Sequence, residues 1–360
     1  MKLSIKLKKV LHKLGQYYFP FNHLSNERLQ EILNHIRVIE LQQDEILQIK
    51  GGDSQDYLYL IEGQIDVLCD GNIQMLTHPE ETQRRPVLLP DKQQRCSIIA
   101  RDDSIICHAK RDSLDTIIAW DYIGRHKRES LQYIDIIRNT LAFGDLPAEC
   151  IEKAFSQMQS HTACKGDSIQ SSQCDAFYLI KSGSAEVQQL SSRTQDKLII
   201  TTLSTGDIFG NAAQISGKSL DETVVMLEDC ELMVLSKQDY KEIITRPIVK
   251  TVQAIVAKTM LDNGYQLLDV RFAEEYAEQH IAGSQLIPLE ELNKQMASLN
   301  KKQPYIVYCH SGPRSAVAAM LLNDQGFEAL SLEGGIRDWP FELEISSANP
   351  NVVAINQKFH

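Results

Sequence analysis

The stretch "PYIVYCHSGPRSAVAAMLLNDQG", residues 304–326, predicts a strand, a short loop and a helix in immediate succession. Cys309 ends the apolar strand, and we expect the helix to begin at Arg314 or Ser315. The loop between them consists of His310, Ser311, Gly312 and Pro313. Successive N–H groups of such a loop, except at Pro313, can surround the sulfur as an anion nest. The helix N-terminus and Arg314 would favour the thiolate, so the stretch predicts a nucleophile.

The other seven cysteines have no comparable setting, and we expect them to be buried free thiols. None forms a CxxC pair, so neither a zinc ribbon nor a dithiol redox motif is indicated. We therefore expect neither a metal site nor a cofactor. These cysteines are Cys69, Cys96, Cys107, Cys150, Cys164, Cys174 and Cys230.

The sequence around Cys309 alternates between strand and helix patterns from Val249 onward. Strands alternating with helices of this length predict a parallel, doubly wound α/β sheet. Catalytic loops in such folds follow the carboxyl ends of the strands, which is where Cys309 stands.

Four motifs, "LLDVR", "EYAEQHIAGSQLIPL", "IVYCHSGPRSAVAA" and "LEGGIRDW", give this region its resemblance to the rhodanese family. The resemblance implies a sulfurtransferase in which Cys309 takes the sulfane sulfur of a donor such as thiosulfate. The persulfide would then pass its sulfur to a thiol or another nucleophile, such as cyanide. Arg314 would orient the loop and hold the anionic donor, and His310 would tune the charge at its mouth.

The loop length separates sulfur transfer from phosphate chemistry. Four residues lie between Cys309 and Arg314. The sulfurtransferases that the chain resembles have that number, whereas related phosphatases and arsenate reductases have one more, which makes room for a larger oxyanion. Phosphatase activity is therefore not expected.

Other residues of this region have supporting interpretations. Asp269 and Arg271 of "LLDVR" end a strand and are expected to form an ion pair within the framework. His280 is interpreted as a hydrogen-bonded structural histidine. Trp339 and the turn at residues 333–335 are expected to serve packing and positive-φ backbone positions.

Two earlier segments, beginning at Leu24 and Leu146, resemble each other. Each contains an amphipathic helix, a polar turn and a strand, around Tyr59 in the first copy and Tyr178 in the second. A separation of about 120 residues indicates a duplicated domain rather than a solenoid repeat. The short strands of alternating polarity that follow predict all-β jelly-roll barrels with flanking helices.

Both copies resemble the cyclic-nucleotide-binding family in the order of these elements, over residues 15–125 and 138–246. The resemblance implies a phosphate-binding loop with Gly-Glu followed by an arginine, at a helix N-terminus. The second copy keeps Gly210, but Asn211 stands in place of the glutamate, and Glu222, followed by Thr223, in place of the arginine. The first copy offers only Arg95 near the expected position. A carboxylate would repel phosphate, so a structural or protein-contact role, or another anionic ligand, is favoured over cAMP or cGMP.

The composition excludes several other classes of protein. A net charge of −11 argues against a nucleic-acid-binding protein, and no recognition helix follows the barrels. No run approaches the ~18 apolar residues of a membrane span, and the basic N-terminal helix lacks the features of an export signal. We therefore expect a cytoplasmic protein without a membrane partner. The amphipathic segment 120–143 predicts either a homodimer contact or packing between the barrels.

The sequence thus predicts two barrels at residues 1–137 and 138–247, a rhodanese domain at residues 248–346 and a tail at residues 347–360. The leading hypothesis is sulfur transfer through a Cys309 persulfide, regulated or targeted by the N-terminal domains. The alternative is a signalling or scaffold protein whose rhodanese domain senses persulfide or oxidation without turnover. A transcriptional regulator is a third class, and it lacks a helix to read DNA.

Overall fold

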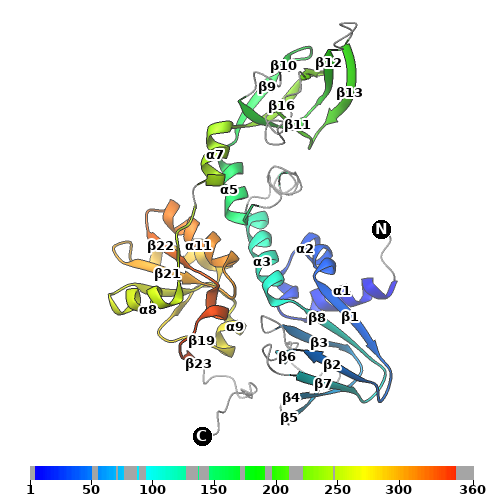
Figure 1. Ribbon diagram of the computed structural model, residues 1–360, viewed down its shortest axis with the longest axis vertical. Coiled ribbons are helices and arrows are strands. Elements are labelled where there is room, and N and C mark those ends of the chain that lie inside the picture. The colour runs from blue at the N-terminus through cyan, green and yellow to red at the C-terminus, as the bar shows by residue number, and fades with distance from the viewer. Residues whose placement is uncertain are drawn as a thin grey trace. The chain divides into compact units, whose positions relative to one another are not determined.

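The computed structural model describes most of the chain, which divides into two compact units (Figure 1). One unit combines residues 1–122 with 251–360, and the other comprises residues 123–250. Asn211, the tail from residue 346 and most of residues 127–145 lie outside the described part, as does the side chain of Arg95. The described residues are 5–50, 56–69, 72–76, 87–88, 95–126, 137, 146–170, 175–190, 197–210, 222–245 and 248–345.

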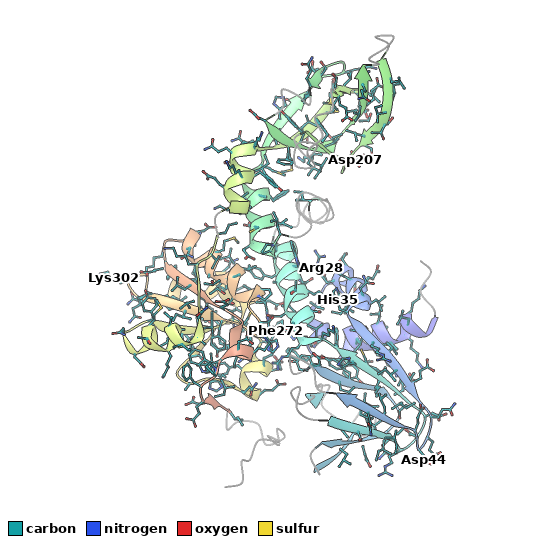
Figure 2. All side chains as sticks on the ribbon, viewed as in Figure 1. Arg28, His35, Asp44, Asp207, Phe272 and Lys302 are labelled. Atoms are coloured by element: carbon teal, nitrogen blue, oxygen red, sulfur yellow. The ribbon has the colours of Figure 1, made fainter. Side chains whose placement is uncertain are left out.

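The first barrel is a β-sandwich of two antiparallel sheets. One described sheet has the strand order β1-β8-β3-β6 and the other β2-β7-β4-β5. The strands are β1 (Ile36–Leu41), β2 (Ile46–Lys50), β3 (Tyr57–Glu62), β4 (Ile65–Cys69), β5 (Asn72–Leu76), β6 (Val87–Leu88), β7 (Arg95–Ala100) and β8 (Ser104–Ala109). Asp44, labelled in Figure 2, makes the turn between β1 and β2 with φ of 65°.

The second barrel repeats this topology in the other unit. Its sheets have the orders β9-β16-β11-β14 and β10-β15-β12-β13, which match the first barrel strand for strand. The strands are β9 (Gln159–Ala163), β10 (Ser168–Gln170), β11 (Ala176–Ser182), β12 (Ser184–Leu190), β13 (Lys197–Ser204), β14 (Ile208–Gly210), β15 (Glu222–Met226) and β16 (Cys230–Ser236). The duplication predicted from the sequence is therefore present in the fold.

A β-bulge at the same point in β3 and in β11 shows which residues of the two barrels are equivalent. The pairing register shifts between Leu60 and Glu62 in β3, and between Ile180 and Ser182 in β11. A glycine with positive φ follows each bulge, Gly63 in one barrel and Gly183 in the other. Measured from the bulge, Leu60 corresponds to Ile180, so the two Tyr-Leu-Ile triplets are offset by one residue.

Helices cover the barrels. Val10 and Leu14 of the first helix are buried in an apolar cluster with Tyr59 and Ile61 of β3, as expected for a packed amphipathic helix. The second barrel's cluster lies around Ile180, Phe209 and Leu232. The helices are α1 (Ile5–Tyr17), η1 (Phe21–His23), α2 (Asn26–Glu31), η2 (Ile32–Asn34), α3 (Arg111–His126), α5 (Ala148–Gln157) and α7 (Lys237–Thr245).

The C-terminal region forms a parallel sheet with flanking helices. The sheet order is β17-β22-β21-β18-β20 within the described residues, and every pairing in it is parallel. Its strands are β17 (Thr251–Val252), β18 (Gln266–Asp269), β20 (Gln285–Leu286), β21 (Pro304–Tyr308) and β22 (Glu328–Leu332), and β19 (His280–Ile281) pairs separately with β23 (Leu343–Glu344). The helices are α8 (Ala254–Asp262), α9 (Ala273–Glu278), α10 (Leu289–Gln295), η4 (Met296–Ser298), α11 (Pro313–Asp324) and η5 (Gly335–Asp338).

The middle strand of this sheet explains why Cys309 is held in place. The side chains of β21 from Tyr305 to Tyr308 are at most 3% exposed, so the strand is buried on both faces, as its apolar sequence predicts. The helix α11 begins one residue earlier than expected, at Pro313, whose missing N–H is not needed in the first turn. Strand, loop and helix therefore follow one another as the sequence predicts.

No helix in the described part of the chain has the length and apolar character needed to cross a membrane.

Candidate active site

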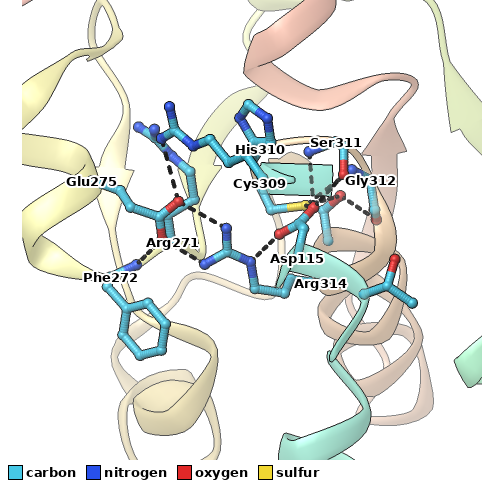
Figure 3. A network of polar contacts seen from close by, with 12 residues as sticks. Asp115, Arg271, Phe272, Glu275, Cys309, His310, Ser311, Gly312 and Arg314 are labelled. Carbon is cyan, nitrogen blue, oxygen red and sulfur yellow. Dashed lines mark hydrogen bonds and ion pairs between the residues drawn. The ribbon is translucent and has the colours of Figure 1, made fainter. Parts of the chain in front are cut away.

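Cys309 lies directly after β21, where the loop turns into α11 (Figure 3). The N–H of Gly312 donates to Sγ of Cys309 at 3.1 Å. Gly312 has φ of 122°, a conformation that side chains other than hydrogen disfavour. The Ser315 hydroxyl lies 3.5 Å from the sulfur and donates to the carbonyl of Gly312 at 2.9 Å. The loop therefore curls around the sulfur, but of its described N–H groups only that of Gly312 donates to the sulfur, whereas the anion nest expected from the sequence uses several.

The state of the thiol differs from the expectation. Cys309 is completely buried, and this burial together with the neighbouring carboxylate of Asp115 raises the pKa of the thiol to about 12. Arg314 and Ser315 act in the opposite direction but do not outweigh these two effects. The prediction of a thiolate is thus wrong for this arrangement, because a carboxylate stands beside the sulfur.

Arg314 divides its guanidinium between two buried carboxylates. Nη1 and Nη2 donate to the two oxygens of Glu275 at 2.6 and 2.9 Å, and Nε donates to Oδ1 of Asp115. Burial alone would raise the pKa of Glu275, but Arg314 and then Arg111 hold it well below its usual range. The ring of Phe272 lies 5.7 Å from the Arg314 guanidinium carbon. Arg314 is therefore fixed in orientation by charge on both sides.

Asp115 reaches the site from α3, which closes the first barrel. Its Oδ2 accepts from the N–H of Ser311 at 2.9 Å and from the Ser311 hydroxyl at 2.7 Å. The same oxygen lies 3.2 Å from Sγ of Cys309. Burial opposes ionisation of Asp115, but Arg314 and the hydrogen bond from Ser311 lower its pKa below the usual range. The Ser311 N–H, which could otherwise face the sulfur, therefore binds the carboxylate of Asp115.

His310 is buried beside a second acidic residue of α3. Its Nε2 lies 3.2 Å from Oδ1 of Asp112, whose Oδ2 accepts from Nη1 of Arg337 at 2.7 Å. Burial and the nearby Arg111 lower the pKa of His310 to about 4, so the imidazole is neutral at pH 7. A neutral His310 adds no positive charge at the loop mouth at pH 7, so it does not tune the charge there in the way that the sequence analysis expects.

The turn at residues 333–335 supports the loop from behind. The N–H of Ile336 donates to the carbonyl of Cys309 at 2.9 Å, and the N–H of Arg337 donates to that of His310 at 3.1 Å. Gly334 and Gly335 have φ of 70° and 62°, as the positive-φ interpretation requires. This turn fixes the backbone at the nucleophile.

The ion pair between Asp269 and Arg271 has the geometry that the sequence suggests. Both side chains are completely buried, and Nη2 of Arg271 donates to Asp269 at 2.6 Å and to the carbonyl of Gln279 at 2.8 Å. His280 stacks on Tyr276 and contacts its carbonyl at 3.0 Å, a structural arrangement.

The predicted nucleotide residues are only partly described. Gly210 ends β14 with φ of 107°, and Glu222 and Thr223 begin β15, where they pair with Gln189 and Gln188. Asn211 and the side chain of Arg95 lie outside the described residues, so their predicted roles are untested. In the described residues, no group of three or more His, Cys, Asp or Glu side chains is placed to hold a metal ion.

Three acidic residues of the site were missed by the sequence analysis. Glu275 lies in the segment "EYAEQHI" that marks the rhodanese resemblance, so its burial beside Arg314 was within reach of a closer motif analysis. Asp112 and Asp115 come from "RDSLDTIIAW", about two hundred residues before the loop. That segment has only the pattern of a helix that closes a barrel.

Comparisons with known proteins match two parts of the chain. A model of the rhodanese-like domain matches residues 253–341, and a model of the cyclic nucleotide-binding domain matches residues 168–246. Thiosulfate sulfurtransferase GlpE of Coxiella burnetii is 36% identical over 24% of this chain and 80% of its own length. The cAMP-dependent protein kinase regulatory subunit of Yarrowia lipolytica is 23% identical over 67% of this chain.

A solved structure of a rhodanese-like domain protein from Staphylococcus aureus is 34% identical over 28% of this chain and all of that chain, with a TM-score of 0.26. The chain spans 63% of the kinase regulatory subunit and 51% of a further curated relative from Bacillus subtilis. Through its C-terminal residues the chain belongs to the rhodanese family, and it also carries a cyclic nucleotide-binding domain.

Proposed function

We propose that the protein is a sulfurtransferase that carries sulfane sulfur as a persulfide on Cys309. The observation that carries the proposal is the position of the sulfur, at the end of a buried strand and within 3.1 Å of the Gly312 N–H. The α11 N-terminus and Arg314 stand beside it, and both favour negative charge at this point.

The first step would begin with the Cys309 thiolate. The thiolate attacks the outer sulfur of thiosulfate, a new S–S bond forms, and the original S–S bond breaks with its electron pair leaving on sulfite. Cysteine persulfide and sulfite carry the same total charge as thiolate and thiosulfate, so no other oxidant or reductant is needed. The Gly312 N–H would donate to the sulfur, and Arg314 would attract the dianionic donor.

The second step would regenerate the enzyme. An acceptor thiolate attacks the outer sulfur of the persulfide, which becomes the acceptor's persulfide while the electron pair of the broken bond returns to Cys309. Cyanide would react in the same way and give thiocyanate. The four-residue loop between Cys309 and Arg314 has the length found in the sulfurtransferases that the chain resembles, which supports sulfur rather than phosphoryl transfer.

The test is intact-protein mass spectrometry after incubation with thiosulfate to a constant endpoint, so that slow access to Cys309 does not hide the reaction. We expect a gain of one sulfur atom in the wild type and none in Cys309→Ser. An unmodified wild-type protein at the endpoint, with folding verified by circular dichroism, would exclude thiosulfate as donor. Equal gain in both proteins would place the reactive cysteine elsewhere.

A second candidate function is a sensor that takes up sulfur without turnover. The complete burial of Cys309 favours it, since both donor and acceptor must reach the thiol in each catalytic cycle. Multiple-turnover formation of thiocyanate from thiosulfate and cyanide distinguishes the two. A persulfide that forms once and is not discharged by cyanide or thiols would support the sensor.

A further inference from the structure

Three charged residues of α3, Arg111, Asp112 and Asp115, each contact oppositely charged or polar residues of the rhodanese domain. Asp115 contacts the loop and Arg314, and Asp112 contacts His310 and Arg337. Nη2 of Arg111 lies 3.6 Å from Glu275 and 3.7 Å from Glu278. Asp115 lies three residues after Asp112 and four after Arg111, spacings that bring side chains to the same side of a helix, so α3 presents all three groups together.

Further contacts between the two domains in the same compact unit accompany this ionic face. Phe272, labelled in Figures 2 and 3, stands at the start of α9. It packs edge-on against Phe19 with ring centroids 5.4 Å apart, and it lies in the same apolar cluster as Ile117 of α3. Asn293 of α10 donates to the hydroxyl of Tyr122 at 2.9 Å. The contact therefore includes a packed apolar centre in addition to its charged groups.

Asp115 occupies the place of an anionic substrate. Its two oxygens take the Ser311 N–H, the Ser311 hydroxyl and Nε of Arg314, which are the donors that the loop offers beside the sulfur. A carboxylate resembles one edge of a sulfonate or sulfite group in charge and in the spacing of its oxygens. Thiosulfate bound at Cys309 would need the same N–H and O–H groups. Thiosulfate and the Asp115 carboxylate therefore exclude each other.

Burial adds a steric argument to the electrostatic one. Cys309 has no exposed surface, Asp115 and Arg314 are each 1% exposed, and Ser315 is completely buried. A donor must place its outer sulfur in contact with Sγ, and the 3.2 Å between Sγ and Oδ2 of Asp115 leaves no space for it. In addition, a thiol can donate to Asp115 while it accepts from Gly312, an arrangement that a thiolate could not complete.

The alternative role for Asp115 is that of a general base for the thiol. Its pairing with Arg314 and with both donors of Ser311 disfavours this role, because a carboxylate stabilised in its ionised form is a weak base. A base would also have to leave the donor's place after it takes the proton. Occupation of the site, rather than proton transfer, accounts for all four contacts.

We propose that Asp115 is an internal anion that closes the rhodanese site, and that a sulfur donor reaches Cys309 only when α3 withdraws this carboxylate. The identity of the donor rests on the proposed function, whereas the closure does not. The inference makes the first barrel a regulatory element of the site, with α3 as the part that opens and closes it.

The test measures alkylation of individual cysteines in the full chain by iodoacetamide, followed by peptide mass spectrometry. Two other cysteines serve as internal controls. Cys107 is buried in the first barrel's core, as expected, whereas Cys164 is exposed, so the expectation of a buried thiol is wrong for it. In the wild type, Cys309 should react far more slowly than Cys164. In Asp115→Ala, Cys309 should react on the order of thirtyfold faster if its pKa returns toward the usual range, because the gain in thiolate is partly offset by lower nucleophilicity.

The matched control is Thr116→Ala, which changes the next residue of α3 and leaves the loop contacts intact. It should leave the rate at Cys309 unchanged. If Cys107 also becomes reactive in Asp115→Ala, this variant has opened the barrel. The experiment is then repeated with Asp115→Asn, which keeps the side-chain volume. Asp115→Asn should then accelerate Cys309 while Cys107 stays unreactive. Equal Cys309 rates in the wild type and in a folded Asp115 variant would overturn the closure.

Persulfide formation separates this proposal from the proposed function. Faster alkylation of Asp115→Ala without any persulfide from thiosulfate would keep the closure and reject this sulfur donor. A persulfide that forms at the same rate in the wild type and in Asp115→Ala would keep the sulfurtransferase and reject the closure. Faster persulfide formation in Asp115→Ala would support both.

Discussion

Gly335 lies against the backbone carbonyl of Cys309, so closely that a Cβ atom at this glycine would stand 2.6 Å from the carbonyl oxygen. The oxygen accepts from the N–H of Ile336 at 2.9 Å, and the turn therefore holds the nucleophile by its main chain. A side chain at Gly335 has to displace backbone rather than a flexible neighbour.

The variant Gly335→Ala should lower both stability and persulfide formation. Positive φ and the clash with Cys309 act together, and we expect a loss of about 1–3 kcal/mol in the free energy of unfolding. Gly326→Ala is the matched control, because Gly326 has φ of 83° with no atom within 4 Å of the added Cβ. Denaturant unfolding measures both variants, and equal losses would show that the clash is unimportant.

The variant Glu275→Gln should be strongly destabilising. It removes one carboxylate from Arg314 and leaves part of a buried positive charge uncompensated, a change that typically costs about 3–5 kcal/mol. Glu274→Gln changes the preceding residue of α9 and should cost far less. Urea unfolding of both gives the comparison, and a loss below about 1 kcal/mol in Glu275→Gln would contradict the ionic role given to it.

His310 should make stability depend on pH above the range in which carboxylates titrate. The pKa of His310 in the folded protein is about 4, below the usual 6.5. Between pH 4 and pH 6.5 the imidazole is therefore protonated in the unfolded chain and neutral in the folded protein. The free energy of unfolding should therefore fall as the pH drops from about 6.5 to about 4, by about 3 kcal/mol in total.

The control for this prediction is His310→Gln, which removes the titrating ring. The loss between pH 6.5 and 4 should shrink in the variant. Asp115 and Glu275, whose pKa values are lowered, contribute stability that is lost at lower pH, as the pH falls from their unfolded values toward their folded ones. A wild-type slope that is unchanged in His310→Gln would mean that the imidazole is not the group responsible.

The second barrel should bind cAMP weakly or not at all, although its residues 168–246 match the cyclic nucleotide-binding domain. Glu222 stands where the resemblance expects an arginine, and Glu222→Arg exchanges repulsion of the phosphate for attraction. We expect an affinity gain of at least about a hundredfold by calorimetry. Glu228→Arg makes the same charge change at an exposed position and should gain little. Micromolar binding by the wild type would refute the prediction.

The local pattern around Cys309 sufficed to predict the strand, the loop and the start of α11 within one residue. It sufficed because these elements are contiguous, so apolar run, glycine, proline and helix formers act over a few positions. The duplicated barrels were also predictable, since each copy repeats its own turn and strand patterns. The ion pair of Asp269 and Arg271 lies within one motif for the same reason.

Contacts between distant segments were beyond the sequence. Nothing in "RDSLDTIIAW" marks Asp115 as a partner of Ser311, because a carboxylate on a helix is usually solvated. The thiolate prediction for Cys309 was wrong for this reason: it included the helix end and Arg314 but not a charge that arrives from another domain. A pKa depends on all neighbours, and local sequence shows only some of them.

The charged face of α3 also bears on how such a fused chain can change over time. Once Arg111, Asp112 and Asp115 depend on Glu275, Arg337 and the Cys309 loop, neither domain can be exchanged for a relative without leaving charged groups without their partners in a partly buried interface. Substitutions on one side should then be accompanied by substitutions on the other.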